Sequence, residues 1–397
     1  RPSPPVCTML FVKSSLRPVL LLSSRRSFVT KLPRFVEKRA NEVGTGGRSS
    51  DPGYKVAIFG ATGFLGRYVC AEFGANGALA YIANRGDELE VRHIKPQFDL
   101  GRTRFVFYCP RDRESIKNVI ADADIVVNLV GKYYESMKPY EKKTFPYIGY
   151  KTNYSFEETN VTIARTIAEV CVELQVDNLI HVSSAAADPD SPSEWARTKF
   201  AGEEAVKEVY PWATIIRPTQ LFGHEDKLLN VLALFATRYP FLPLVDDGKS
   251  LTQPVCVNDV ARSIVRICDD PALFEGKRVD LFGPSDYSYK ELADFVLDIT
   301  ERDCKVIGVP KELALLLGNV LQYQRSPPLT PDLVQLQSVD YLPAMTAEQY
   351  AAQKSKDAIV TMENLGLTPT PIEKIAFSYL HRYRRYGHFD KVDGYHS

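Results

Sequence analysis

Residues Tyr54–Gly66 read YKVAIFGATGFLG, and this stretch decides the fold of the chain. The apolar, β-prone run Val56–Phe59 is followed by glycines at 60, 63 and 66 and then by a helical pattern over Arg67–Phe73. Gly60 allows a tight turn, Gly63 lets backbone N–H groups reach a phosphate, and Gly66 lets the helix pack closely on the strand. Because the positive end of that helix faces the turn, the pattern predicts a site for a dinucleotide pyrophosphate.

The same alternation of apolar runs and helical patterns continues along the first half of the chain. Further strands are predicted at Ala80–Asn84, Phe105–Tyr108, Ile125–Val130, Asn178–Ser184 and Trp212–Arg217, with helices over Ser115–Ile120, Glu157–Gln175 and Lys199–Val209. Continuous apolar strands that alternate with helices predict a parallel sheet covered on both faces. The expected fold class is therefore α/β, a Rossmann-type doubly wound parallel sheet with a smaller C-terminal α/β lobe and an extended tail.

Residues at the carboxyl ends of these strands are the candidate ligand contacts, because ligands of such sheets bind there. Arg85 follows the second strand, where a carboxylate would favour a ribose hydroxyl and an arginine favours a 2′-phosphate. Asn84-Arg85 therefore predicts NADP(H) as the cofactor, with a solvated surface arginine as the alternative. Asn128 and Gly131 lie where the fourth strand opens toward the ribose, although a buried structural asparagine explains Asn128 nearly as well.

The composition of the chain argues against a nucleic-acid-binding, metal-binding, disulfide-rich or membrane-spanning protein. Lys+Arg and Asp+Glu both total 49, so the net charge favours neither nucleic acid nor an acidic surface as a partner. The seven cysteines include no CxxC pair, which indicates reduced thiols and predicts neither a metal site nor a disulfide framework. No uncharged apolar run reaches the ~20 residues of a spanning helix, so any membrane contact is expected to be peripheral.

The two ends of the chain differ from its centre. Residues 1–36 hold seven basic residues, several serines and no acidic residue, a pattern typical of a mitochondrial transit peptide; a disordered basic arm is the alternative. We therefore predict a presequence-like segment and linker at 1–53, an NADP-binding Rossmann domain at 54–225, and a smaller C-terminal lobe at 226–397. The C-terminal lobe is expected to carry an interface tail, and some of its elements are expected to return to the core and pack there.

The C-terminal lobe has a weaker pattern. Residues Leu228–Val245 are apolar but interrupted by Arg238, Pro240 and Pro243. A core helix is the preferred interpretation, and an amphipathic lid or a surface-docking helix stays open. Strands are predicted at Gln253–Val257 and Val279–Leu281, with helices at Val260–Cys268 and Pro371–Arg385.

Ser183 and Ser184 close the fifth strand, and the segment SEWARTKFAGE follows. Here the chain resembles the short-chain dehydrogenase/reductase superfamily, whose active members carry Tyr-x-x-x-Lys at this point. The resemblance implies that Lys199 holds the nicotinamide ribose, while Trp195 stands at the tyrosine position. An indole N–H donates a hydrogen bond but cannot pass a proton near neutral pH, so no catalytic residue is assigned.

Eight motifs in order make the resemblance more specific. They are GATGFLGRYV, NRGDE, DLGR, NLVGKYYE, RPTQLFGHED, QPVCVNDVA, GPSDY and MENLGLTPTPIE. From Tyr54 to Phe389 the chain resembles the nucleotide-binding accessory subunits of mitochondrial complex I. That resemblance implies a tightly held NADPH, no turnover, a support role in assembly, and a peripheral place on the matrix side of the inner membrane, near the junction with the matrix arm. One departure is Tyr108-Cys109-Pro110, which replaces an expected aromatic-Asp stretch that contacts adenine.

The predicted cofactor contacts come from the glycine turn, from the ends of four further strands and from one helix. They are Gly60, Thr62, Gly63, Phe64, Leu65, Gly66, Asn84, Arg85, Asn128, Val130, Gly131, Ser183, Lys199 and Pro218. Two other functions stay open: an active NADP-dependent reductase or epimerase whose acid is one of the tyrosines 133, 134, 150 or 154, and an NADPH redox sensor. The expected partners are other complex I subunits. The basic-aromatic tail His381–Phe389 is expected to dock on those subunits or on anionic lipid, and nucleic acid is not expected.

Overall fold

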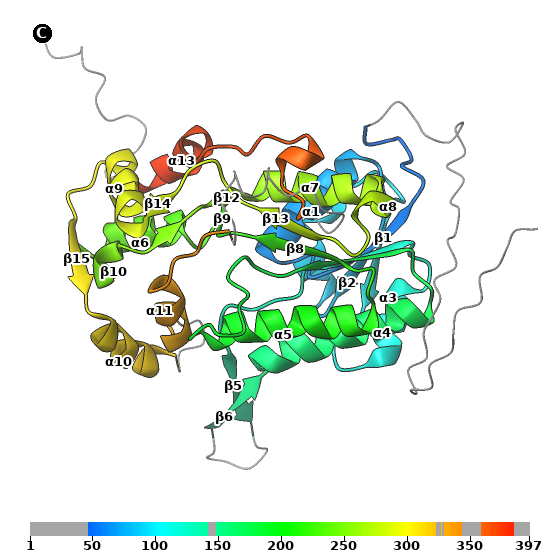
Figure 1. Cartoon of the computed structure of the whole chain (residues 1–397), viewed down its shortest axis with the longest axis horizontal. Coiled ribbons are helices and arrows are strands. Elements are labelled where there is room, and N and C mark those ends of the chain that lie inside the picture. Colours follow the sequence, from blue (N-terminus) through cyan, green and yellow to red (C-terminus); the bar gives the residue numbers. More distant parts are fainter. Residues whose placement is uncertain (1–46, 142–147, 323–326, 328, 344–358, 385–397) are drawn as a thin grey trace, which may run out of the picture. The chain divides into compact units, whose positions relative to one another are not determined.

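The computed structural model of the chain (Figure 1) describes residues 47–141, 148–322, 327, 329–343 and 359–384. The predicted presequence, up to residue 46, and the tail residues 385–389 lie outside these ranges.

A seven-stranded parallel sheet is the centre of the fold. In spatial order its strands are β13 (Arg278–Leu281), β8 (Thr214–Pro218), β7 (Asn178–Val182), β4 (Ile125–Asn128), β1 (Lys55–Phe59), β2 (Leu79–Asn84) and β3 (Thr103–Phe107). The chain runs from β1 outward to β3, then returns to β4 on the other side of β1 and runs outward again. The strand order therefore reverses between β1 and β4, which is where a doubly wound sheet opens a crevice at its carboxyl edge.

Both faces of the sheet are buried, which explains why its strands are apolar throughout. In β1, Val56 and Ile58 face one hydrophobic cluster, while Ala57 and Phe59 face the other. Helices α1 (Phe64–Ala75) and α7 (Val257–Asp269) cover the first face. Helices α3 (Arg113–Ile120), α4 (Ile163–Glu173) and α5 (Glu194–Val209) cover the second.

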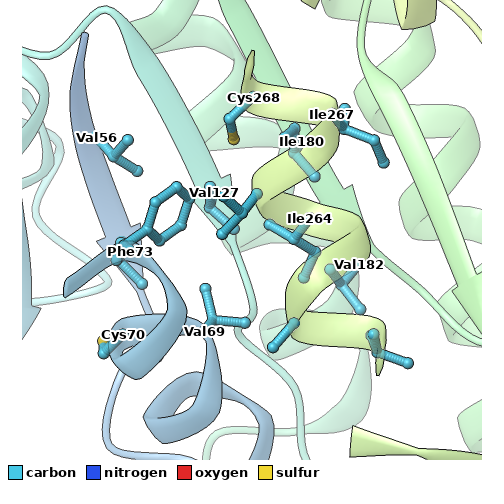
Figure 2. Packing of buried hydrophobic residues seen from close by; sticks show 14 of the residues in the cluster. Val56, Val69, Cys70, Phe73, Val127, Ile180, Val182, Ile264, Ile267 and Cys268 are labelled. Atoms are coloured by element: carbon cyan, nitrogen blue, oxygen red, sulfur yellow. The ribbon is translucent and has the colours of Figure 1, made fainter. Parts of the chain in front are cut away.

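The first cluster ties together parts of the chain that are far apart in sequence. Figure 2 shows Val69 and Phe73 of α1 and Ile264 of α7 packed over sheet residues that include Val127 and Ile180. Because α7 and β13 both follow residue 225, elements of the second half complete the layers that begin with β1. The boundary at residue 225 stays a prediction.

Several predicted boundaries shift in the structure. Strands β4 and β7 each end two residues earlier than predicted, so residues 129–130 and 183–184 leave the sheet. A π-helical turn, Glu158–Thr162, precedes α4 and replaces the first part of the predicted long helix. Helix α5 begins five residues before its predicted start, because Ser193 caps it by accepting a hydrogen bond from the N–H of Ala196.

A further hydrophobic cluster is formed mostly by residues after 225, and this part of the chain corrects one prediction. Residues 228–245 do not form one helix: α6 (Leu229–Arg238) is followed by β10 (Phe241–Val245), which pairs in parallel with β15 (Lys305–Val309). Pro240 follows the end of α6, since proline cannot continue a helix. Helices α9 (Tyr289–Thr300) and α13 (Ile372–Leu380) pack with α6.

Shorter elements complete the described chain. They are α2 (Glu88–Val91), the antiparallel hairpin β5 (Ser136–Glu141) and β6 (Ile148–Asn153), β9 (Leu221–Phe222), β11 (Leu251–Thr252), β12 (Val255–Cys256), α8 (Pro271–Phe274), β14 (Tyr287–Ser288), α10 (Lys311–Leu321) and α11 (Pro331–Gln337), with 3-10 turns at Lys95–Gln97, Asp246–Gly248, Glu363–Leu365 and His381–Tyr383. Of the strand predicted at Gln253–Val257, only Val255–Cys256 forms a strand, β12, and it pairs with β9 instead of extending the central sheet. Within the described ranges no helix is both long and apolar enough to cross a membrane.

Candidate nucleotide-binding site

The glycine turn between β1 and α1 has no space for side chains at two of its positions. Gly60 has φ +84°, and a Cβ built on it would lie 3.0 Å from the backbone carbon and oxygen of Leu129. A Cβ on Gly66 would lie 2.3 Å from the carbonyl oxygen of Gly60. Backbone therefore packs directly on backbone, and the first turn of α1 comes close to the ends of β1 and β4.

The N-terminus of α1 is not capped by any side chain. Gly63 is the N-cap residue, in an extended conformation, and the first turn contains no acidic residue. By contrast, α3 and α5 are capped by the side chains of Asp112 and Ser193. The first N–H groups of a helix need partners and carry positive charge, so the start of α1 is suited to an anion.

A cleft opens beside this turn, at the crevice between β1 and β4. Its lining comprises Gly60, Gly63, Phe64, Leu65, Gly66, Leu129, Gly131, Lys132, Tyr133, Val182, Ser183, Ser184, Trp195, Lys199, Pro218, Thr219, Leu221 and Tyr341. Nine of the fourteen predicted cofactor contacts are among them: Gly60, Gly63, Phe64, Leu65, Gly66, Gly131, Ser183, Lys199 and Pro218. The structure therefore brings most of the predicted set together in one place.

The other five predicted contacts are not among the residues that line the cleft. Thr62 is exposed in the glycine turn, Val130 follows β4, and Arg85 is exposed after β2. The Asn84 side chain is bound to its own turn: its Nδ2 donates to the carbonyl oxygen of Gly86 at 2.8 Å. Asn128 accepts from the N–H of Val130 at 3.0 Å. Both asparagine side chains thus hydrogen-bond to the backbone near predicted contacts.

Lys199 places a buried ammonium group at the cleft. The residue is 6% exposed, and its Nζ lies 3.0 Å from where a Cβ on Gly131 would stand. Burial lowers its pKa to about 8, against an opposing effect of Glu203. Glu203 is itself bound to Arg217, with oxygens 2.6 and 2.8 Å from guanidinium nitrogens. Among the described residues, the ammonium of Lys199 has no hydrogen-bond or ion-pair partner, which fits a polar ligand in the cleft.

Aromatic side chains fill the opposite half of the cleft. Trp195 is 4% exposed and stacks on Tyr133 with ring centroids 5.4 Å apart. Tyr341 lies in the same half, and its hydroxyl is hydrogen-bonded to that of Ser184. In the described chain, neither Trp195 Nε1 nor Ser183 Oγ has a hydrogen-bond partner. The place where a substrate carbonyl would meet Ser184 is therefore taken by a side chain of the protein itself.

Tyr341 reaches the cleft on a segment that we call the strap, residues 330–341. At one end, Asp332 accepts hydrogen bonds from Ser193 Oγ at 3.0 Å and from the N–H of Glu194 at 2.7 Å, at the N-terminus of α5. At the other end, the N–H of Tyr341 donates to the carbonyl oxygen of Leu251 at 2.8 Å. Sequence reasoning missed Asp332 and Tyr341, because no local pattern signals contacts with Ser193 and Ser184 across 139 and 157 residues.

The tyrosines considered as substitute acids have other surroundings. Tyr133 stacks on Trp195, and Lys227 lies 5.6 Å from the ring centroid of Tyr134. The ring of Tyr154 lies among three basic side chains. The side chain of Tyr150, in β6, lies outside the described part of the chain.

The residues after β3 and in the tail are bound internally. Tyr108 is buried and packs edge-on against Phe59, with centroids 5.3 Å apart, and burial raises its pKa to about 12. In the tail, Arg382 donates to Asn230 Oδ1 at 2.7 Å and Arg384 Nε donates to the carbonyl oxygen of Ile299 at 2.9 Å. These two tail arginines thus bind residues of α6 and α9 in their own chain.

The described residues contain no grouping of three or more His, Cys, Asp or Glu side chains that would hold a metal ion. Six of the seven cysteines fall in the described ranges, and all six are free thiols.

The fold is shared with nucleotide-binding enzymes of known structure. A dTDP-glucose 4,6-dehydratase from Bacillus anthracis, solved in complex with NAD, superposes with a TM-score of 0.59 at 16% identity, covering 83% of this chain and 96% of that one. At this level of identity the likeness shows the fold alone.

Comparison with known sequences gives closer relatives. Residues 56–280 match the model of the NAD dependent epimerase/dehydratase family. NADH dehydrogenase (ubiquinone) 1 alpha subcomplex subunit 9, mitochondrial, of Arabidopsis thaliana is 34% identical over 346 residues, 87% of this chain and 81% of its own length. The protein of the same name from Mus musculus is 32% identical, over 93% of this chain and 91% of its own length. The chain therefore belongs to the NAD dependent epimerase/dehydratase family and, within it, to the family of the mitochondrial complex I alpha subcomplex subunit 9 proteins.

Proposed function

We propose that this chain is a non-catalytic accessory subunit of mitochondrial respiratory complex I that binds NADPH and uses it to stabilise its fold. It acts at the matrix side of the inner membrane as a peripheral subunit that supports assembly of the matrix arm near the membrane junction. Its relatives carry the name of a mitochondrial complex I subunit, over most of both chains, and this supports the assignment.

One observation carries the proposal: the same cleft combines an anion seat with a blocked reaction site. Gly60, Gly63 and Gly66 leave bare backbone and an uncapped helix N-terminus, which suits a pyrophosphate. Lys199 supplies a buried ammonium for a ribose hydroxyl. The residues present thus fit a dinucleotide, whose nicotinamide would supply hydride chemistry if a substrate and a proton donor were at hand.

The reaction site lacks that proton donor and that space. Trp195 stands one helical turn before Lys199, and an indole N–H does not ionise near neutral pH. Tyr341 binds Ser184, the residue where a substrate carbonyl would accept a hydrogen bond. Binding without turnover follows, because the pocket holds the cofactor half of the site and fills the other half.

Retention of a nucleotide without chemistry has a thermodynamic reason. A ligand that binds only the folded state stabilises it by ~2.7 kcal/mol when its concentration is a hundred times its dissociation constant. The buried ammonium of Lys199 and the uncapped end of α1 both lower stability when no ligand compensates for them. A permanently bound nucleotide would satisfy both groups.

The test uses the full chain in cells that lack their own copy. Gly63→Asp puts a carboxylate against the pyrophosphate seat, and we expect it to lower both the nucleotide content of the purified chain and the amount of assembled complex I on native gels. Gly101→Ala, at a positive-φ turn where a Cβ has open space, is the control. Normal assembly of the Gly63→Asp variant would contradict the support role, and substrate-dependent oxidation of NADPH by the purified wild type would contradict the non-catalytic role.

A further inference from the structure

Three basic side chains surround the ring of Tyr154. The guanidinium carbons of Arg85 and Arg111 lie 5.9 and 4.4 Å from its centroid, and Lys132 Nζ lies 5.8 Å from it. Arg85 follows β2, Arg111 follows β3, and Lys132 follows β4, which is separated from β2 by β1, so three strand ends at the carboxyl edge of the sheet contribute one cation each. We call these three residues and Tyr154 the cation cluster.

The backbone of Tyr154 has an unusual conformation. Its φ is +65°, a left-handed conformation that a bulky residue rarely adopts. The ring is partly buried against the second hydrophobic cluster of the core. A guanidinium that stacks on an aromatic face keeps the N–H groups at its edge available for an anion. Tyr154 therefore acts as a platform that holds Arg111 in place.

Arg111 already has an anionic partner in the chain. Its Nη2 lies 2.9 Å from Glu158 Oε2, and its Nε is hydrogen-bonded to Oε1 of the same carboxylate. The side chain of Arg111 remains 54% exposed, so this pair forms at the surface rather than in the core. Exposed pairs contribute little to stability, which makes the partner of Arg111 exchangeable.

The position of the cation cluster at the carboxyl edge of the sheet indicates which anion it binds. The ribose of the adenosine half of a dinucleotide binds at the carboxyl end of the second strand of such a sheet, next to Arg85. A phosphate on that ribose carries about two negative charges and three acceptor oxygens, which matches several converging N–H donors. A nucleotide without this phosphate presents only hydroxyl groups there.

We propose that the cation cluster is the seat of the ribose 2′-phosphate, with Arg111 and Lys132 as specificity-determining residues beside Arg85 and with Glu158 as an internal competitor for Arg111. This proposal rests on the proposed function, since it concerns the same nucleotide. It adds that Glu158 weakens NADPH binding: the carboxylate occupies the fork of Arg111 that the phosphate needs.

The experiment measures the dissociation constants of NADPH and NADH by calorimetry on the full chain. Arg111→Gln should weaken NADPH about tenfold or more and leave NADH within about twofold, as expected for the loss of a charged hydrogen-bonding pair. Glu158→Gln should tighten NADPH several-fold and leave NADH unchanged. Arg113→Gln is the matched control, because Arg113 is 49% exposed, is paired with Glu169 and Glu173, and lies two residues away.

The results distinguish failure of the proposed function from failure of the assignment of the cation cluster. If the wild type binds neither nucleotide, the proposed function fails. If the wild type binds NADPH but Arg111→Gln behaves like Arg113→Gln, or if Glu158→Gln weakens NADPH, the cluster is not the phosphate seat and the proposed function stands. If Arg111→Gln weakens NADPH and NADH equally while thermal unfolding is unchanged, Arg111 supports the cleft in general and the specificity assignment is wrong. Selective protection of the wild type by inorganic phosphate, with equal affinity for NADPH and NADH, would overturn the assignment to a nucleotide.

Discussion

The two halves of the cleft are built in opposite ways. On the side of α1, the protein removes side chains: Gly60 and Gly66 leave no space for a Cβ, and no side chain caps the helix. On the side of α5, it adds them: Trp195 stacks on Tyr133, and Tyr341 binds Ser184. One half is left for a ligand, and the other is occupied by the chain itself.

This difference separates binding from catalysis within one fold. A nucleotide seat made of backbone needs only the strand-turn-helix geometry, which the glycines maintain. Turnover needs in addition a proton donor and space for a substrate, and in the function that we propose both are missing on the α5 side. The four predictions that follow test the two halves separately, from the largest effect to the smallest.

Trp195→Ala tests whether the α5 half is a packed core. The side chain is 4% exposed and belongs to a small cluster with Phe156. We expect the free energy of unfolding to fall by about 3–5 kcal/mol, measured by denaturant titration, because a large cavity is left. Trp212→Ala, at a less buried indole, is the control and should cost less. An equal loss of unfolding free energy in the two variants would show that the α5 side of the cleft is packed no more tightly than the surroundings of Trp212.

Lys199→Met tests whether the buried ammonium is kept for a ligand. The pKa of Lys199 in the folded chain is lowered to about 8 from its ordinary 10.5, so the unfolded chain binds this proton more tightly. Stability of the wild type should therefore rise as pH increases from about 8 to about 10.5, and below pH 8 the ammonium costs about 3 kcal/mol.

The comparison of the two proteins isolates this group from other titrating residues. Without nucleotide, Lys199→Met should be more stable than wild type below pH 8, and the difference should disappear above about pH 10.5. Thermal unfolding across this pH range measures it. A variant that is less stable at pH 7, in the absence of nucleotide, would show that Lys199 serves the fold and not a ligand.

Gly66→Ala tests the close approach on the α1 side. The added Cβ would lie 2.3 Å from the Gly60 carbonyl oxygen, which is backbone and cannot move aside cheaply. Overpacking of this kind costs about 1–3 kcal/mol, and the displaced turn should also lose affinity for NADPH. Gly366→Ala meets no atom within 4 Å but is strained by its φ of +71°, a strain that helical Gly66 does not have, so it shows the cost of conformation without contact. If Gly66→Ala bound NADPH with unchanged affinity, the glycine turn would not be part of the nucleotide site.

Asp332→Ala tests the strap. Its carboxylate accepts hydrogen bonds at the N-terminus of α5, and loss of such a cap costs about 0.5–2 kcal/mol. The free energy of unfolding should fall by about that amount, with NADPH affinity within a few-fold of wild type because Asp332 is not part of the cleft lining. Asp87→Ala, at the cap of the four-residue helix α2, should have a smaller effect. If the two variants lose equal stability, the strap is a surface feature without a structural role.

Local patterns in the sequence predicted the parts of the fold that depend on neighbouring residues. The glycine turn, six of the seven sheet strands with small shifts, and the pairing of Lys199 with a tryptophan one turn earlier all follow from spacing within about ten residues. The seventh strand, β13, was predicted as a strand at Val279–Leu281, but its place at the sheet edge needed the structure.

Long-range contacts were beyond the sequence pattern. Tyr341 meets Ser184 across 157 residues, and β10 pairs with β15 across a stretch that contains α7 and α9. A single apolar run with prolines, such as residues 228–245, is compatible with a helix or a strand until its partner is known. The cation cluster was missed for the same reason: only Arg85 stands at a position that a motif marks, and Arg111 and Lys132 join it through the order of the strands.

Native mass spectrometry of the full chain, purified without denaturation and presented with NADPH, tests the central claim most directly. The account predicts one NADP(H) per chain, retained through gentle desolvation by the wild type and lost from Gly63→Asp, with no change in nucleotide redox state over time. A wild-type chain that stays free of nucleotide at saturating NADPH would contradict it.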